Sequence, residues 1–586
     1  MAWGLANLWK QGNEGGYAVR HGRQPVNDFS RPRRGEEAEM PSADTHNYFE
    51  KAFPCLFPYG RGGPESNRPQ EVSFNDHIKY ALQYHDRRFR KHETFPFVTF
   101  GISQRRQALN SARIQIRRKN FEADARVFST ITLDKLEQAR IEEEKNLPIS
   151  DLAVRLLRKH MHATGGRVVG SDQSRYQLRS QIWSTSIYMN PPSLWITINP
   201  CDLHDPIAQV FAGEQINMDD FFATLGPNKE KRAQNIADDP YAASHFFHFM
   251  IKTIFQTLFG VEVTQFQVKV DIGVLGKIAA YFGTVESQGR GSLHLHLLIW
   301  LRNAPTSDEM QELLKTEEFR RKVTEYIRAN LRAHLPGLDS VEAVKSIPNE
   351  VEIAYSRPPH PDSANYEDAM TKFELRVARA KQVHTCEFRR CLFWNKKGQV
   401  QCKRRAPFKC SEVDMVTESG NWAPKRLYEF MNGWVPALTV NVRCNNDGKL
   451  LTNGGDTRNI TFYVSSYAAK KQGKNFNTSA VMAKGYAYHT NHSAYISNLR
   501  DNQRLLIFRL VHAINREQEL AAVMVISYLM GWGDVYRSHH YTYIYWSSFV
   551  GALLKAFPDL RDVARSVTLN SEPTFITNYS MQKEAK

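Results

Sequence analysis

Two histidines, His294 and His296, flank a single leucine in the apolar segment that runs from Leu293 to Trp300. If this segment is a strand, alternate side chains point to opposite faces, so both imidazoles lie on one face while the leucines enter the core. Two imidazoles on one face can bind a divalent cation if a third ligand is near. The alternative is a pair of structural histidines in a packed core.

Two side chains upstream could supply that third ligand. The segment 277–286 precedes the histidine segment, and the two predict a β-hairpin of residues 277–286 and 293–301. Glu286 offers a carboxylate from the first strand, and Gln288 could offer a carbonyl oxygen instead. The sequence therefore predicts a cation site built from the two histidines with Glu286 or Gln288.

The charge of the chain favours a nucleic acid partner. There are 77 Lys and Arg residues against 61 Asp and Glu residues, which gives a net charge of +16. The Gly289-Arg290-Gly291 turn of the predicted hairpin allows a nucleic acid backbone to approach closely. Arg290 is then available to bind phosphate.

A second candidate group is a pair of tyrosines, Tyr463 and Tyr467, on a helix expected near residues 460–472. The i, i+4 spacing stacks the phenols on one face, and Lys470 and Lys471 follow beside it. A phenol with a pKa of about 10 is a poor nucleophile at neutral pH, but a cation that polarises a phosphate and a nearby ammonium group would assist it. The alternative is an aromatic pair that faces the core. Together with the histidines, the tyrosines are the parts of a metal-assisted nuclease.

Four of the seven cysteines crowd into residues 386–410, which is too uneven a distribution for a disulfide scaffold. Thiolates and an imidazole at short spacing favour tetrahedral zinc in a structural role. We choose as ligands His384, Cys386, Cys391 and Cys402, with Cys410 in reserve. The alternative is a set of unpaired buried cysteines.

A chain of 586 residues, of which 42% are hydrophobic, is expected to form roughly three to four globular domains. The order of expected elements predicts an α+β fold with a central antiparallel sheet flanked by helices: a strand at 194–200, a core helix at 240–259, the hairpin, a helix at 308–334 and a strand at 438–443. The predicted division is a disordered basic arm (1–45), a helical N-terminal DNA-binding module (46–168), the first part of the core with the histidine strand (169–345), a linker and zinc-binding insert (346–425), the second part of the core with the tyrosine helix (426–500) and a helical C-terminal segment (501–586).

Five segments in order resemble the Rep region of Helitron transposases. They are Phe53–Gly60, Trp195–Leu203, the histidine segment, the cysteine stretch from His384 to Phe408 and the tyrosine segment. The nuclease of that family belongs to the HUH class, which is named for a His-hydrophobic-His motif. The resemblance therefore implies an HUH-type nuclease core.

The resemblance also implies a rolling-circle transposase that nicks one DNA strand and joins its 5′ end covalently to tyrosine. By that resemblance Tyr463 and Tyr467 are the nucleophiles, and His294 and His296 bind Mg²⁺ or Mn²⁺. The expected partners are single-stranded DNA of transposon ends and target, and the expected location is the nucleus of a eukaryotic host.

Complete members of this family continue into a superfamily 1 helicase. The phosphate-binding pattern G-x-x-x-x-G-K-[ST] does not occur in the sequence, so we expect any helicase to be supplied elsewhere. We expect no membrane partner, since no run of about 18 apolar residues occurs. Two other functions fit the same motifs: a DNA-binding module whose catalysis has decayed, and a plasmid-type relaxase or replication initiator.

Overall fold

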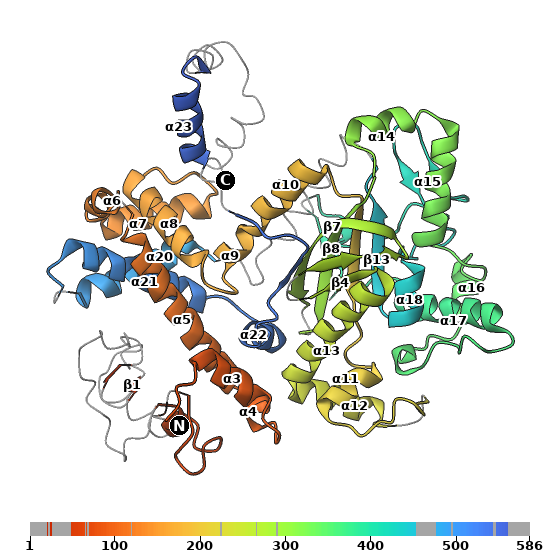
Figure 1. Ribbon diagram of the computed structural model, residues 1–586, viewed down its shortest axis with the longest axis horizontal. Helices are drawn as coiled ribbons and strands as arrows, with labels where there is room; N and C mark the ends of the chain where they lie inside the picture. Colours follow the sequence, from red (N-terminus) through yellow and green to blue (C-terminus); the bar gives the residue numbers. More distant parts are fainter. Residues whose placement is uncertain are drawn as a thin grey trace. The chain divides into compact units, whose positions relative to one another are not determined.

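The protein is a mixed α/β chain that contains helices and an antiparallel sheet (Figure 1). The computed structural model of the protein describes residues 20–21, 24–25, 48–64, 66, 69–118, 120–222, 226–264, 267–288, 291–388, 390–395, 397–452, 476–493, 496–542 and 546–560.

The chain divides into two compact units, each assembled from segments that are far apart in sequence. Unit 1 takes the described parts of residues 1–107, 174–473 and 519–538, and unit 2 those of residues 108–173, 474–518 and 539–586. The six domains predicted from the sequence are continuous ranges, whereas each of these units combines separate ranges. The six-domain division therefore stays a prediction.

The central sheet of unit 1 has six strands among the described residues, in the order β13-β3-β8-β7-β14, with β6 also paired to β7. All of these pairings are antiparallel. The long hairpin β7–β8 matches the predicted one closely, because both strands are rich in apolar residues. The strands are β3 (Leu194–Asn199), β6 (Ile272–Gly273), β7 (Gly276–Ser287), β8 (Leu293–Leu301), β13 (Asn445–Leu450) and β14 (Val535–Arg537).

One face of this sheet packs on helices through a continuous apolar core. Leu295 and Leu297 of β8 and Ile196 of β3 are fully buried in it, together with Phe246 of α13 and Met524 of α22. Helix α13 begins at Pro240, where a missing backbone donor costs nothing, and the Asp239 side chain caps it. The helices of this part are α10 (Leu178–Met189), α11 (Pro206–Ala212), α12 (Lys229–Asp238), α13 (Pro240–Thr253), the π-helical turn η2 (Ile254–Leu258) and α22 (Ala522–Leu529).

The remaining elements of unit 1 lie N-terminal to α10 or between the elements given above, and α9 begins in unit 2 and ends in unit 1. Aromatic residues of the N-terminal helices, such as Phe49 and Phe95, join the same core. Their bounds are α2 (Tyr48–Ala52), α3 (Phe74–Leu82), α4 (Arg88–Lys91), α9 (Asp172–Tyr176), β4 (Val261–Val263), β5 (Val268–Val270), α14 (Ser307–Leu313), α15 (Glu317–Asn330), α16 (Val341–Ser346), η3 (Ile353–Tyr355), α17 (Tyr366–Lys381), β9 (Leu392–Trp394), β10 (Val400–Cys402), β11 (Met415–Val416), β12 (Trp422–Ala423) and α18 (Pro436–Val442), besides the short pair β1 (Arg20–His21) and β2 (Gln24–Pro25).

Unit 2 is helical in its described residues and has its own core, to which Phe121, Phe128, Leu157, Met482 and Leu510 belong. The Glu143 carboxylate accepts hydrogen bonds from the backbone amides of Thr478 and Ser479 and thereby holds the start of α20. Helix α5 (Phe95–Gln115) begins in unit 1 and ends in unit 2. The others are α6 (Phe121–Phe128), α7 (Leu133–Glu144), α8 (Leu152–Gly165), α20 (Thr478–Asn491), α21 (Leu499–Arg516) and α23 (Trp546–Ala556).

Two sequence-based expectations about elements were wrong. The predicted strand at 438–443 is part of helix α18 (Pro436–Val442), and the strand of this region is β13, which follows it. The predicted helix at 308–334 is two helices, because α14 ends at Leu313 and α15 begins at Glu317. The tyrosine helix expected near 460–472 lies outside the described residues.

Candidate metal centres

The first candidate centre lies on the face of the sheet opposite the helical core of α13. His294 and His296 sit two residues apart on β8, so their side chains share a face. Across the hairpin, Glu286 of β7 is the Cα partner of His294, and Thr284 is the partner of His296. The hairpin register therefore places one carboxylate beside two imidazoles.

The three side chains converge at their tips. The Nε2 atoms of His294 and His296 are 2.9 Å apart, and Oε2 of Glu286 lies 3.8 Å from each of them. The three form a group of potential metal ligands. Thr197, on the neighbouring strand β3, places its Oγ1 3.2 Å from Nδ1 of His296. That contact leaves Nε2 of His296 pointing toward the other two ligands.

The group is shielded from solvent, with His294 7% exposed and His296 8% exposed. Burial lowers the pKa of His294 to about 4, and the positive charges of Arg175 and Arg404 act in the same direction. His294 is therefore neutral at physiological pH, which is the form of histidine that binds metal ions.

A buried arginine positions the carboxylate. Arg175 of α9 is only 1% exposed, and its guanidinium donates to Asp534 at 2.5 Å and to the carbonyl oxygen of Val285 at 3.1 Å. The same guanidinium lies 3.8 Å from Oε1 of Glu286. One oxygen of Glu286 thus faces Arg175 while the other faces the histidines.

These residues fit a divalent cation. Adjacent ligands of an octahedral ion with bonds of about 2.1 Å lie about 3 Å apart, which the histidine nitrogens match at 2.9 Å. The carboxylate is slightly farther away at 3.8 Å, within reach of a small rotation of its side chain. Two imidazoles and one carboxylate leave further positions open on such an ion, where a substrate oxygen can bind.

Of the other residues predicted for the nuclease site, the structure describes Gln288 alone. Gln288 is exposed and its side-chain nitrogen donates to Oδ1 of Asn199 at 3.0 Å, and its role as a ligand stays a prediction. Five predicted residues lie outside the described part of the chain: Arg290, Tyr463, Tyr467, Lys470 and Lys471.

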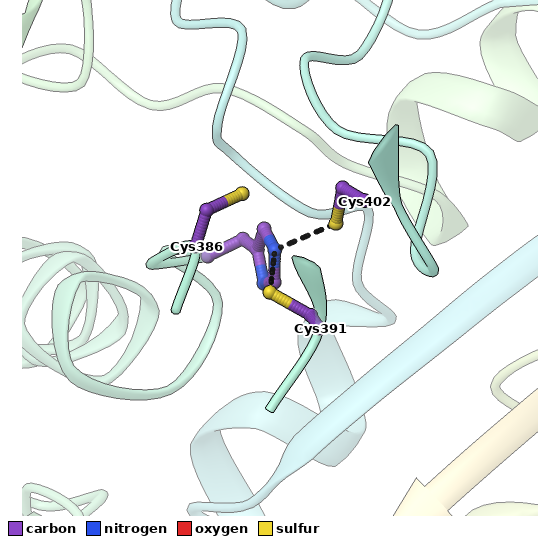
Figure 2. Close-up of side chains that lie close together, drawn as sticks. Cys386, Cys391 and Cys402 are labelled. Carbon is purple, nitrogen blue, oxygen red and sulfur yellow. Dashed lines mark hydrogen bonds between the residues drawn. The ribbon is translucent and has the colours of Figure 1, made fainter. Parts of the chain in front are cut away.

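The second candidate centre is a cluster of one histidine and three cysteines (Figure 2). His384 Nε2 lies 3.2 Å from Sγ of Cys402 and 3.5 Å from Sγ of Cys391, and the cluster also includes Cys386. In a tetrahedral zinc site with bonds of about 2.0 Å to nitrogen and 2.3 Å to sulfur, nitrogen and sulfur ligands lie about 3.5 Å apart. The cluster could therefore hold a metal such as zinc.

Backbone amides favour thiolates in this cluster. Glu387 donates its backbone N–H to Sγ of Cys391, and Arg404 donates to Sγ of Cys402, both at 3.3 Å. Burial tends to raise the pKa of the Cys402 thiol, but hydrogen bonds from the backbone N–H groups of Ala406 and Arg404 and from the thiols of Cys386 and Cys391 together lower it. Such donors around the sulfur atoms are typical of metal-binding thiolates.

Cys410 is placed differently from the four residues of the cluster. It is exposed, and its sulfur lies near the carbonyl oxygens of Phe408 and Leu427 rather than near His384. The structure thus gathers the four preferred ligands and leaves the reserve ligand outside the group.

Residues 77–299 match the family model described as "Helitron helicase-like domain at N-terminus". The match includes β3, α13 and the β7–β8 hairpin with all three residues of the first centre, whereas the cysteine cluster lies beyond it. Residues 77–299 are thus similar to the N-terminal region of Helitron proteins. Among curated proteins, none matches this chain.

Sequence reasoning missed two residues of the first centre. Thr197 was part of a predicted strand, but a lone threonine in a β-branched run carries no signal of its contact with His296. Arg175 gives no local signal of its role, because its partner Asp534 is 359 residues away in sequence. In the part of the chain that the structure describes, no helix is long and apolar enough to cross a membrane.

Proposed function

We propose that this protein is a single-strand DNA endonuclease and strand transferase of a Helitron-type rolling-circle transposon, with an HUH-type nuclease core. The observation that supports this most strongly is the convergence of Glu286, His294 and His296 on one face of an antiparallel sheet, inside the region that matches the Helitron model. A buried pair of histidines beside a carboxylate is suited to bind a divalent cation.

The proposed reaction is a transesterification at a DNA phosphate. The phenolic oxygen of Tyr463 or Tyr467 attacks the phosphorus and forms an O–P bond, while the bond from phosphorus to the 3′ oxygen breaks. The tyrosine loses its proton, and the leaving 3′ oxygen takes one up. The 5′ end is then held as a phosphotyrosine ester, which conserves the energy of the broken bond for rejoining.

A cation held by the first centre, Mg²⁺ or Mn²⁺, would supply the charge that polarises the phosphate. The same ligand set binds Fe²⁺ in some oxygenases, but the Helitron match favours phosphate chemistry. Lys470 and Lys471 are proposed to stabilise the charge that develops on the phosphate. Zn²⁺ at the cysteine cluster would have a structural role, and the nucleus is the proposed site of action.

Labelled single-stranded DNA incubated with the protein and Mn²⁺ tests the proposal. A covalent adduct is expected that survives denaturant, and it should disappear in the double variant Tyr463→Phe/Tyr467→Phe. His294→Ala should abolish nicking while DNA affinity changes little. A large loss of affinity with residual nicking would contradict the metal role of His294.

A DNA-binding module without catalysis is the second candidate, and the high positive charge of the chain favours it. It predicts DNA binding but no adduct on any sequence tested. A plasmid-type relaxase or initiator is a weaker candidate, because it is not expected to carry both the cysteine insert and the Phe53–Gly60 segment.

A further inference from the structure

The hairpin β9–β10 presents an exposed aromatic surface beside the cysteine cluster. Trp394 and Val400 are directly opposite partners, and Cys402 opposes Leu392 two residues along, so these side chains share one face of the hairpin. Cys402 is buried at the base of that face, whereas Trp394 is 66% exposed near the tip. Phe388, between two residues of the cluster, is 64% exposed. Two exposed rings thus lie in the segment that carries the cysteine cluster, where an unpaired base could stack on them.

The segment that carries this hairpin, residues 384–410, is strongly basic. Residues 384–410 contain eight basic residues (Arg389, Arg390, Lys396, Lys397, Lys403, Arg404, Arg405 and Lys409) and one acidic residue, Glu387, so their net charge is +7 of the +16 of the whole chain. Lys403, Arg404 and Arg405 follow directly after Cys402 and are all exposed. The cluster, if it holds a metal, fixes the backbone of this basic run.

Arg404 is tied to the cysteine cluster by its backbone. Its backbone N–H donates to Sγ of Cys402 at 3.3 Å. The side chain of Arg404 is exposed, so its charge is available to a ligand on this surface.

We propose that the exposed face of the β9–β10 hairpin, with the basic run from Lys403 to Arg405 that follows it, binds single-stranded DNA. The Trp394 ring stacks on an unpaired base, and Arg404 binds a phosphate of the same strand. The proposed function supplies the reason for a single-stranded substrate, whereas the binding of the strand rests on the surface itself.

The chemistry of the surface selects a single strand over a duplex. An exposed ring beside basic side chains is the usual platform for single-stranded nucleic acid, because each unstacked base offers a face to the ring while cations track the phosphates. In a duplex the bases are already stacked on one another, so only the phosphate contacts remain.

The test measures the affinity of the full-length, zinc-loaded protein for labelled oligothymidine and for a labelled duplex by fluorescence anisotropy. Divalent cations other than the bound zinc are left out, so that no cleavage occurs. The variants are Trp394→Ala, Trp394→Phe and Arg404→Gln, and their zinc content is measured to show that the cluster is intact. Phe222→Ala and Arg321→Gln are matched controls, because Phe222 is similarly exposed and Arg321 is an exposed arginine on α15.

Trp394→Ala is expected to weaken single-strand binding by roughly 5- to 150-fold, which corresponds to the loss of one stacked base. Trp394→Phe should keep most of the affinity, and duplex binding should change little in both variants. Arg404→Gln should weaken both forms and reduce the salt dependence of binding. An unchanged affinity in Trp394→Ala, or an equal loss for strand and duplex, overturns the proposal, as does a loss of the same size in the controls.

Adduct formation with Mn²⁺ separates this proposal from the proposed function. If the wild-type protein forms no adduct but Trp394→Ala loses single-strand affinity, the nuclease fails and the binding surface stands. If the adduct forms and the Trp394 and Arg404 variants bind as the wild type does, the binding surface fails and the nuclease stands.

Discussion

Glu286 and His294 face each other as Cα partners across the β7–β8 hairpin, and their side chains meet at 3.8 Å. This pairing ties the carboxylate to the histidine pair through the backbone register. Glu286→Gln keeps the size of the side chain but removes its charge, so we expect affinity for Mn²⁺ to fall by about tenfold or more. Calorimetric titration of Mn²⁺ measures this. Glu312→Gln, on exposed helix α14, is the control and should bind as the wild type does.

Thr197 orients His296 through the contact between its Oγ1 and the Nδ1 of the ring. Thr197→Val removes the oxygen at almost constant shape, and we expect Mn²⁺ affinity to fall by roughly 10- to 100-fold. Thr197→Ser keeps the hydroxyl and should retain most of the affinity. Nitrogen NMR of the histidine tautomers, with the titration, measures both effects. Wild-type affinity in the valine variant would refute this role.

Arg175 is a buried cation whose removal takes the cationic partner from the Asp534 carboxylate, which keeps a neutral hydrogen bond from the Tyr528 hydroxyl. Arg175→Met should lower the free energy of unfolding by about 3–5 kcal/mol, because it leaves an unpaired charge in the interior. The double variant Arg175→Met/Asp534→Asn should recover part of that loss. Urea denaturation of the three proteins measures this. Equal stability of Arg175→Met and the wild type would mean that the carboxylate has another source of compensation.

Cys402 and Cys410 are matched probes of the cysteine cluster, since one lies within it and the other outside. Cys402→Ser should lose most of the bound zinc, because it removes one of four ligands. Cys410→Ser should keep one zinc per chain. Elemental analysis of the purified proteins after dialysis measures the content. Zinc loss in both variants would place Cys410 among the ligands.

His248 gives the fold a dependence on pH. Its Nε2 lies 2.8 Å from the Ser527 hydroxyl, and its Nδ1 lies 2.5 Å from the Tyr536 hydroxyl. The Ser527 hydroxyl donates its proton to the Gly533 carbonyl, so it accepts a hydrogen bond from Nε2. Nδ1 of the neutral ring then carries no proton and accepts a hydrogen bond from Tyr536. Burial lowers the pKa of His248 to about 3. Protonation would therefore place two donors against each other in the interior.

The folded pKa of His248 lies below its value of about 6.5 in the unfolded chain, so the unfolded state takes up the proton first. Stability is highest above pH 6.5 and should fall by about 2 kcal/mol between pH 7 and pH 5 from this group. Urea denaturation across this range measures the slope, and His248→Gln should flatten it. Burial also lowers the pKa of His204, to about 4, so some dependence should persist in the variant.

The centre on the hairpin was predictable because its ligands are close in sequence and its strands have a strong apolar pattern. The cysteine cluster was predictable because its four ligands are also close in sequence. The strand at 445–450 was not, because Asn446, Asp447 and Gly448 have low strand propensity. The fold compensates for this: Asn446 is buried, accepts a hydrogen bond from the amide of Val435 and donates one to Thr439. Such compensation comes from tertiary contacts, which no local pattern reports.

The order of strands in the sheet has a consequence for synthesis on the ribosome. Strands β3, β7 and β8, with all three ligands of the first centre, are complete once the chain reaches Leu301. Their outer neighbours β13 and β14 come from residues 445–450 and 535–537, so both edges of the nascent sheet, apart from the short pairing of β6 with β7, stay unpaired until much later. Unpaired edges recruit strands from other chains. Copies of the gene that terminate between Leu301 and Asn445 should therefore yield aggregating products rather than inert ones.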